Sequence, residues 1–154
     1  MASGRAVIVG CLKNSEQFLP SVFLNLQKLA SLYEEVAYVF VENDSRDLTK
    51  QILKEWGTQQ KSFQLISFDG LDAYETHRTV RLEIARNAYI HAVISNSRFH
   101  DFDELIVMDM DDRGSFPLNE DHLSHALSFL RQESQRAAVF ANQPVRYYDL
   151  WALR

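Results

Sequence analysis

The chain has 154 residues, of which 46% are hydrophobic and 24% charged, with a formal net charge of −5. This length suits one domain spanning residues 1–154, and the apolar and aromatic content excludes an intrinsically disordered chain. The acidic balance disfavours nucleic-acid binding, the single cysteine excludes an internal disulfide framework, and no apolar run reaches the ~18 residues of a membrane span.

Short apolar segments alternate along the chain with segments of helical periodicity. Residues 6–9 form an apolar run that ends at Gly10, and apolar residues then recur at helical spacing from Leu19 to Tyr33, with Pro20 in the first turn. The further predicted strands are 36–41, 63–68, 105–108, 137–140 and 145–153. The further predicted helices are one that Ser45 or Asp47 caps and that runs to Trp56 before Gly57, one from about Thr76 to Ser97, and one that follows Pro117 and runs through Leu130. Residues 69–76 are expected to form a loop.

This alternation predicts an α/β fold with a mostly parallel sheet and helices on both faces, because parallel neighbours need crossover connections. We expect a protein without a signal peptide, located in the cytoplasm. Ligands of such folds bind at the carboxyl ends of the strands. The residues that follow each strand are therefore the first candidates for a functional site.

Three acidic residues, Asp109, Asp111 and Asp112, follow the predicted strand at 105–108. Their mutual repulsion needs compensation, and a divalent cation such as Mn2+ or Mg2+ would supply it through oxygen ligands. The alternative is a solvated turn at a strand end. The apolar strand at 105–108 would place the three aspartates at the ligand-binding edge of the sheet, and this position favours the metal site over the solvated turn.

The predicted helix at 76–97 carries three arginines. Arg78 and Arg81 share a face, whereas Arg86 points about 140° away from Arg81 at ~100° per residue. Such a cationic face suits a phosphate or the polar edge of a base, and an ordinary solvated face is the alternative. Apolar residues surround most of this helix, which predicts that it is buried and that its arginines have partners.

The stretch RLEIARNAYIHAV from Arg81, followed by a strand and DMDD, resembles the ARN…DxDD signature of nucleotide-sugar glycosyltransferases of the GT-A fold. The nearest pattern is the large family-2-like group. The segments VGCLKN and VENDS occupy the places of that family's nucleoside-contacting loops, and the closing YYDLWALR resembles relatives of capsule mannosyltransferases. The resemblance covers nearly all of the chain and implies a Rossmann-like GT-A fold.

The resemblance also implies roles for single residues. Asp111 would ligate Mn2+ or Mg2+, which bridges the donor's diphosphate, and Asp109 would contact the metal or the donor ribose. Glu42 and Asn43 would face the nucleobase and ribose. The family usually has two acids there, so Asn43 departs from the pattern and the identity of the nucleobase is not specified. The remaining candidates for nucleotide binding are Gly10, Cys11, Asn14, Arg78, Arg81 and Met110.

The implied partners are a nucleoside-diphosphate sugar, such as a UDP- or GDP-sugar, a glycan or other hydroxyl acceptor, and a second copy in a homo-oligomer. Inverting transfer also needs a general base, which the family supplies well after the metal motif. Asp149 is the only acid in the closing segment and is the candidate, with an exposed strand aspartate as the alternative reading. The chain therefore resembles a donor-binding half: a minimal natural form, a truncated form or one partner of an assembly.

Three functions remain in competition. The first is a metal-dependent glycosyltransferase. The second is a non-catalytic nucleotide-sugar-binding module, which the missing base would explain. The third is a metal-dependent phosphohydrolase of the haloacid-dehalogenase type, whose DxD motif normally follows the first strand and precedes Thr or Val. Here DMDD follows the fourth predicted strand and Asp112-Arg113 come next, which disfavours the third.

Overall fold

The structure, a computed structural model, describes residues 4–140. The chain divides after Leu118 into two compact units, and each is described by itself. The first unit holds the sheet and its helices, and the second holds one described helix, α5 (Glu120–Arg131). That the whole chain is one domain stays a prediction.

The sheet is four-stranded and all-parallel, with the order β3-β2-β1-β4. Its strands are β1 (Arg5–Leu12), β2 (Glu35–Asn43), β3 (Phe63–Phe68) and β4 (Glu104–Val107). At the centre of the sheet Val9 lies between Val39 of β2 and Val107 of β4. The predicted α/β class is confirmed: the fold is Rossmann-like, with a parallel sheet flanked by helices.

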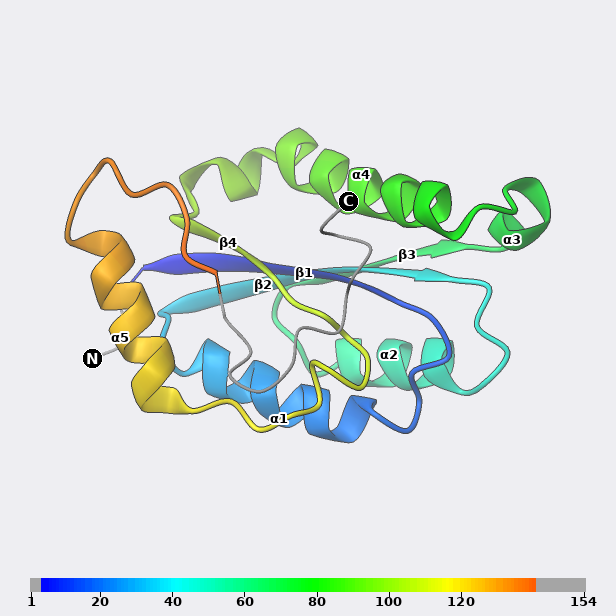
Figure 1. Cartoon of the computed structure of the whole chain (residues 1–154), viewed down its shortest axis with the longest axis horizontal. Coiled ribbons are helices and arrows are strands. Elements are labelled where there is room, and N and C mark those ends of the chain that lie inside the picture. Colours follow the sequence, from blue (N-terminus) through cyan, green and yellow to red (C-terminus); the bar gives the residue numbers. More distant parts are fainter. Residues whose placement is uncertain (1–3, 141–154) are drawn as a thin grey trace. The chain divides into compact units, whose positions relative to one another are not determined.

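Helices cover both faces of the sheet, as Figure 1 shows: α4 lies over one face and α1 and α2 over the other. Their bounds are α1 (Leu19–Ala30), α2 (Thr49–Gly57), α3 (Leu71–Tyr74) and α4 (Arg78–Ser95), followed by the 3-10 helix η1 (Ser97–Asp101). Ala85 and Tyr89 of α4 pack on Val7, Val9 and other valines of β1 and β2. This packing holds the first turn of α4 beside the carboxyl ends of the strands.

Several predicted boundaries were wrong. Helix α2 begins at Thr49, and of the two predicted caps it is Asp47, not Ser45, whose side chain accepts a hydrogen bond from the Thr49 N–H, at 3.0 Å. The predicted loop at 69–76 contains the short helix α3. Residues 137–140 are irregular rather than a strand, and the predicted strand at 145–153 lies outside the described residues.

Helix α4 is less buried than its composition predicted. Ala85 and Tyr89 are its buried residues, whereas Ile94 is 65% exposed. Leu105 and Val107 of β4 lie on the α4 side of the sheet, since they pair with Val7 and Val9, and they are 51% and 60% exposed. The prediction failed because apolar composition shows what a helix could bury, not how many of its sides meet a neighbour.

The strand order places a topological switch point between β1 and β4. The chain moves from β1 outward through β2 to β3, and then returns to the opposite side of β1 for β4. In open parallel sheets the loops that follow the two strands at such a point frame the ligand site. Here those loops begin at Lys13 and at Met108.

Among the described residues no helix is both long and apolar enough to cross a membrane.

Candidate functional site

The segment that follows β4 alternates between buried and exposed residues. Met108 and Met110 are buried on one side, and Asp109 and Asp111 are exposed on the other. A Cβ on Gly10 would lie 2.5 Å from Cγ of Met110 and 2.8 Å from the carbonyl oxygen of Met108, so only glycine permits this close approach. The close packing of Gly10 against Met110 therefore anchors the acidic segment, and the buried Met110 side chain is not available for a nucleotide.

A tight turn follows the two aspartates. Oδ1 of Asp111 accepts a hydrogen bond from the Arg113 N–H at 2.9 Å, and the Asp111 carbonyl accepts one from the Ser115 N–H at 3.2 Å. Residues 109–115 are hereafter called the acidic turn. Its aspartate side chains lie at the carboxyl edge of the sheet, on the β4 side of the switch point.

Cys11 lies near two charged residues of this region. Burial raises the pKa of the Cys11 thiol to about 11, the positive charge of Arg86 opposes this shift and the negative charge of Asp109 adds to it. The same two charges act on the pKa of Tyr89, which burial raises. Arg86 on α4 and Asp109 after β4 thus share one neighbourhood with Cys11 at the end of β1.

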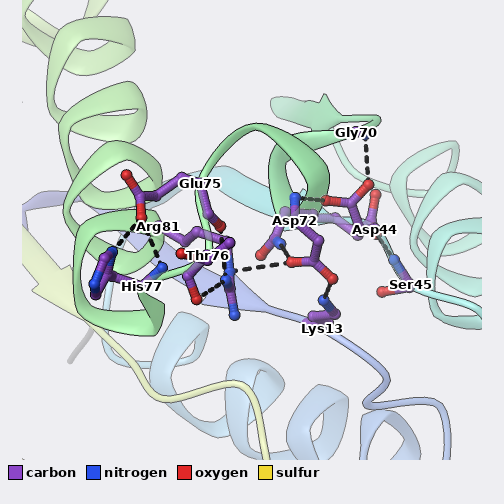
Figure 2. A network of polar contacts seen from close by, with 11 residues as sticks. Lys13, Asp44, Ser45, Gly70, Asp72, Glu75, Thr76, His77 and Arg81 are labelled. Atoms are coloured by element: carbon purple, nitrogen blue, oxygen red, sulfur yellow. Dashed lines mark hydrogen bonds and ion pairs between the residues drawn. The ribbon is translucent and has the colours of Figure 1, made fainter.

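A second polar cluster lies on the β2 side of the sheet edge, and Figure 2 shows it from close by. Its centre is Asp72 of α3, whose carboxylate contacts the ammonium of Lys13 and, at 3.1 Å from Oδ1, the Nε of Arg81. The side-chain amide of Asn43 donates to the same oxygen at 3.3 Å. Residues from the loop after β1, from β2, from α3 and from α4 therefore meet at one carboxylate. These residues are called the Asp72 cluster below.

Arg81 also closes the loop before its own helix. Its Nη1 donates to the carbonyl oxygens of Glu75 and Thr76, both at 2.8 Å. The guanidinium is thus used within the chain, where the resemblance implied contact with the base or diphosphate. Arg78 is exposed, and no hydrogen bond or ion pair joins it to another residue in the described part of the chain.

The two acids at the end of β2 have structural partners. Glu42 is 1% exposed; its Oε1 accepts from the Ser45 N–H and its Oε2 from the Ser67 hydroxyl, both at 2.7 Å. The pKa of the Asp44 carboxyl is lowered, first of all by a hydrogen bond from the Gly70 N–H. Because both of its oxygens accept hydrogen bonds within the protein, the buried Glu42 carboxylate stabilises the end of β2. Of Glu42 and Asn43, the two residues expected to face the nucleoside, Asn43 is therefore the one nearer to solvent.

Asn14 connects the loops after β1 and β2. Its side-chain oxygen accepts a hydrogen bond from the Arg46 N–H at 2.8 Å, and its own N–H donates to the Ser45 hydroxyl at 3.0 Å. Its φ of 50° lies in the left-handed region, which asparagine tolerates better than most residues. The predicted nucleotide loop is therefore held rigidly against its neighbour.

The structure brings most of the predicted residues to one edge of the sheet in two groups. Asp109 and Asp111 follow β4, with Asp109 near Cys11 at the end of β1. Asn43 and Arg81 meet in the Asp72 cluster. Asp149 lies outside the described residues. Sequence reasoning gave no role to Lys13 or Asp72. It named Arg86 among three arginines that suit a phosphate but did not include it among the site residues, although Arg86 is the arginine of the ARN motif.

Asp109 and Asp111 are exposed residues, and their carboxylate oxygens are of the ligand type that hard divalent cations prefer. Within residues 4–140, no group of three or more His, Cys, Asp or Glu side chains is arranged to hold a metal ion. The residues therefore fit a cation whose other ligands come from water and a bound phosphate, the arrangement that Mg2+ commonly adopts.

No model of a known protein family matches the sequence, and no curated protein matches it either.

Proposed function

We propose that this chain is the donor-binding domain of a metal-dependent glycosyltransferase, which transfers a sugar from a nucleoside-diphosphate sugar to an acceptor hydroxyl. One observation carries the proposal: two exposed aspartates lie at the carboxyl end of β4, directly beside the point where the strand order reverses. This is where open parallel sheets bind nucleotides. The ARN…DMDD resemblance selects the sugar-transfer class among nucleotide-binding proteins.

The residues fit the charge changes of this reaction. When the glycosidic bond to the diphosphate breaks, negative charge builds on the leaving phosphate. A divalent cation bound at Asp111 and Asp109 supplies Lewis-acid stabilisation of that charge. The Arg86 guanidinium, whose charge reaches the Cys11 and Asp109 neighbourhood, adds a fixed positive charge on the α4 side. Asn43, at the end of β2, contributes a polar group on the nucleoside side.

The test is calorimetry of the full chain with UDP- and GDP-sugars, in the presence of Mn2+ or Mg2+ and again with EDTA. We expect binding that requires the metal and is abolished by Asp111→Asn. The matched control is Asp101→Asn, which removes the same charge from an exposed residue in front of the amino end of β4. If none of these sugars binds in a metal-dependent way, the proposal is wrong.

Turnover separates the two functions that share this site. Release of the sugar to water or to an acceptor, lost in Asp111→Asn while the fold persists, identifies an enzyme. Metal-dependent binding without release identifies a nucleotide-sugar-binding module instead. A stable phosphoenzyme at Asp109 would support the phosphohydrolase and contradict both.

A further inference from the structure

The buried face of helix α1 contains one polar residue, Asn25. It is 2% exposed and lies among Val22, Leu26 and Leu29 on the side of the helix that packs against the rest of the fold. Burial of a carboxamide among apolar side chains is unfavourable unless its polar atoms are hydrogen-bonded. Its partners therefore show what Asn25 does.

Within residues 4–140, the side-chain hydrogen bonds of Asn25 all go to the backbone that follows DMDD. Its Nδ2 donates to the carbonyl oxygens of Gly114 at 2.8 Å and Phe116 at 2.7 Å, and its Oδ1 accepts from the Leu118 N–H at 3.0 Å. Lys28, one turn later on α1, donates to the Leu118 carbonyl at 3.0 Å. A single side chain thus fixes every second residue of one loop to the helix.

Gly114 in turn packs against the backbone of Asp109, the first aspartate of the acidic turn. A Cβ at Gly114 would lie 1.7 Å from the carbonyl oxygen of Asp109, so the backbone of Gly114 is packed directly against the Asp109–Met110 peptide. Asn25 is therefore hydrogen-bonded to Gly114, and Gly114 is packed against Asp109. Both ends of the acidic turn are fixed, one by Met110 in the core and the other by Asn25.

We propose that Asn25 is a positioning residue, which orders the acidic turn before metal and nucleotide bind. The inference rests on the proposed function for what the turn binds. A turn that is already ordered loses less conformational entropy on binding, so its ligands associate more tightly. Removal of a residue that orients metal ligands typically costs about 10-fold or more in metal affinity.

The first variant is Asn25→Asp, which has the same shape but presents an acceptor to the Gly114 and Phe116 carbonyls. The second, Gly114→Ala, disrupts the next contact in the same series, because its Cβ would meet the carbonyl oxygen of Asp109, and it tests whether residues 114–118 order the aspartates if Asn25→Asp does not fold. The control is Val22→Ala, which removes core packing on the same face of α1 but removes no hydrogen bond, because valine has an apolar side chain.

The first measurement is hydrogen–deuterium exchange of the full chain without ligand. We expect faster exchange at residues 109–118 in Asn25→Asp and in Gly114→Ala, with β1 and β2 still protected. The second is the calorimetric affinity for Mn2+ with UDP and for Mn2+ with GDP. We expect Asn25→Asp to weaken it by about 10-fold and Val22→Ala to leave it unchanged.

Unchanged exchange at 109–118 in both variants overturns the inference, and so does an equal loss of affinity in Val22→Ala, which would show a general structural effect. If the wild-type chain binds neither probe in Mn2+, the proposed function fails. In that case faster exchange at 109–118 still supports the ordering role of Asn25, and unchanged exchange still contradicts it.

Discussion

The carboxylate of Asp44 accepts a hydrogen bond from the Gly70 N–H at 2.5 Å, which ties the end of β2 to the residue that precedes α3. Its other oxygen accepts from the Asp72 N–H at 2.8 Å. Asp44 thus satisfies two N–H groups at the start of α3, which would otherwise lack helical partners. It also sets the position of Asp72, the centre of the polar cluster.

This relationship predicts a dependence of stability on acid. Because the folded-state pKa of Asp44 lies below its ordinary value of 3.8, the carboxylate stabilises the fold above that pH, and the contribution is lost as the pH falls through the lower, folded-state pKa. Asp44→Asn should therefore be less stable than wild type at pH 6 and approach it at pH 2.5. Urea unfolding at both pH values measures this. An equal difference at the two pH values would contradict the assignment.

The Cys11 thiol gives a probe of the charges around the acidic turn. With a pKa of about 11 against an ordinary 9.0, the thiolate fraction at pH 8 is about 100-fold smaller than in an unperturbed cysteine. Alkylation by iodoacetamide should be slow in the native chain and fast in urea.

Because folding raises the pKa of Cys11, the stability that this residue contributes is complete below pH 9 and is lost as the pH rises towards 11.

Single substitutions should shift the Cys11 pKa in opposite directions. Asp109→Asn removes a charge that raises it and should speed alkylation, whereas Arg86→Gln removes a charge that lowers it and should slow alkylation. Rates measured between pH 8 and 11 give the pKa of each variant. If both substitutions leave the pKa unchanged, the two charges do not lie near Cys11.

Much of the fold could be predicted because the sheet is parallel and its two central strands are buried. Strands covered on both faces are continuous apolar runs, so the central strands β1 and β2 were predicted within three residues of their bounds. The edge strand β3, which is only partly buried, was predicted at its observed bounds. The strand ends then identified Asp109 and Asp111 without knowledge of any contact. The pattern of apolar residues predicts where strands begin and end because it depends only on which residues are buried.

The polar cluster could not be predicted in the same way. Arg81 donates to the carbonyl oxygens of Glu75 and Thr76, and Asp72 lies on a helix of four residues that has no apolar periodicity. Such contacts depend on how two loops approach each other in space, which residue spacing does not specify. Asn25 did leave a signal, a polar residue at a buried position of the α1 pattern, but that signal did not reveal its partners.

The internal contacts of Arg81 predict a structural role that Arg78 does not share. Arg81→Ala removes two charge-assisted hydrogen bonds and the contact with Asp72, at a cost of about 1–2 kcal/mol, because this guanidinium is only partly exposed. Arg78→Ala removes an exposed side chain from the same turn of α4 and should change stability by less than about 0.5 kcal/mol. Urea unfolding of the two variants compares them. Equal effects would show that the Arg81 contacts contribute nothing specific.

The contact between Gly10 and Met110 predicts that the end of β1 does not tolerate a side chain. In Gly10→Ala the new Cβ meets a flexible Met110 side chain, which can rotate, and the Met108 carbonyl, which can move only with the backbone that leads to Asp109. Overpacking of this kind costs about 1–3 kcal/mol. Thermal or urea unfolding measures the loss.

A double-mutant cycle separates the two obstacles at Gly10. Met110→Ala alone leaves a cavity in the core, at a cost of about 2–5 kcal/mol. In Gly10→Ala/Met110→Ala the alanine Cβ occupies part of that cavity, so the double variant should lose less stability than the sum of the single variants. The Met108 carbonyl still obstructs the new Cβ, so recovery should be incomplete. Strict additivity would show that Gly10 and Met110 do not pack against each other in the native chain.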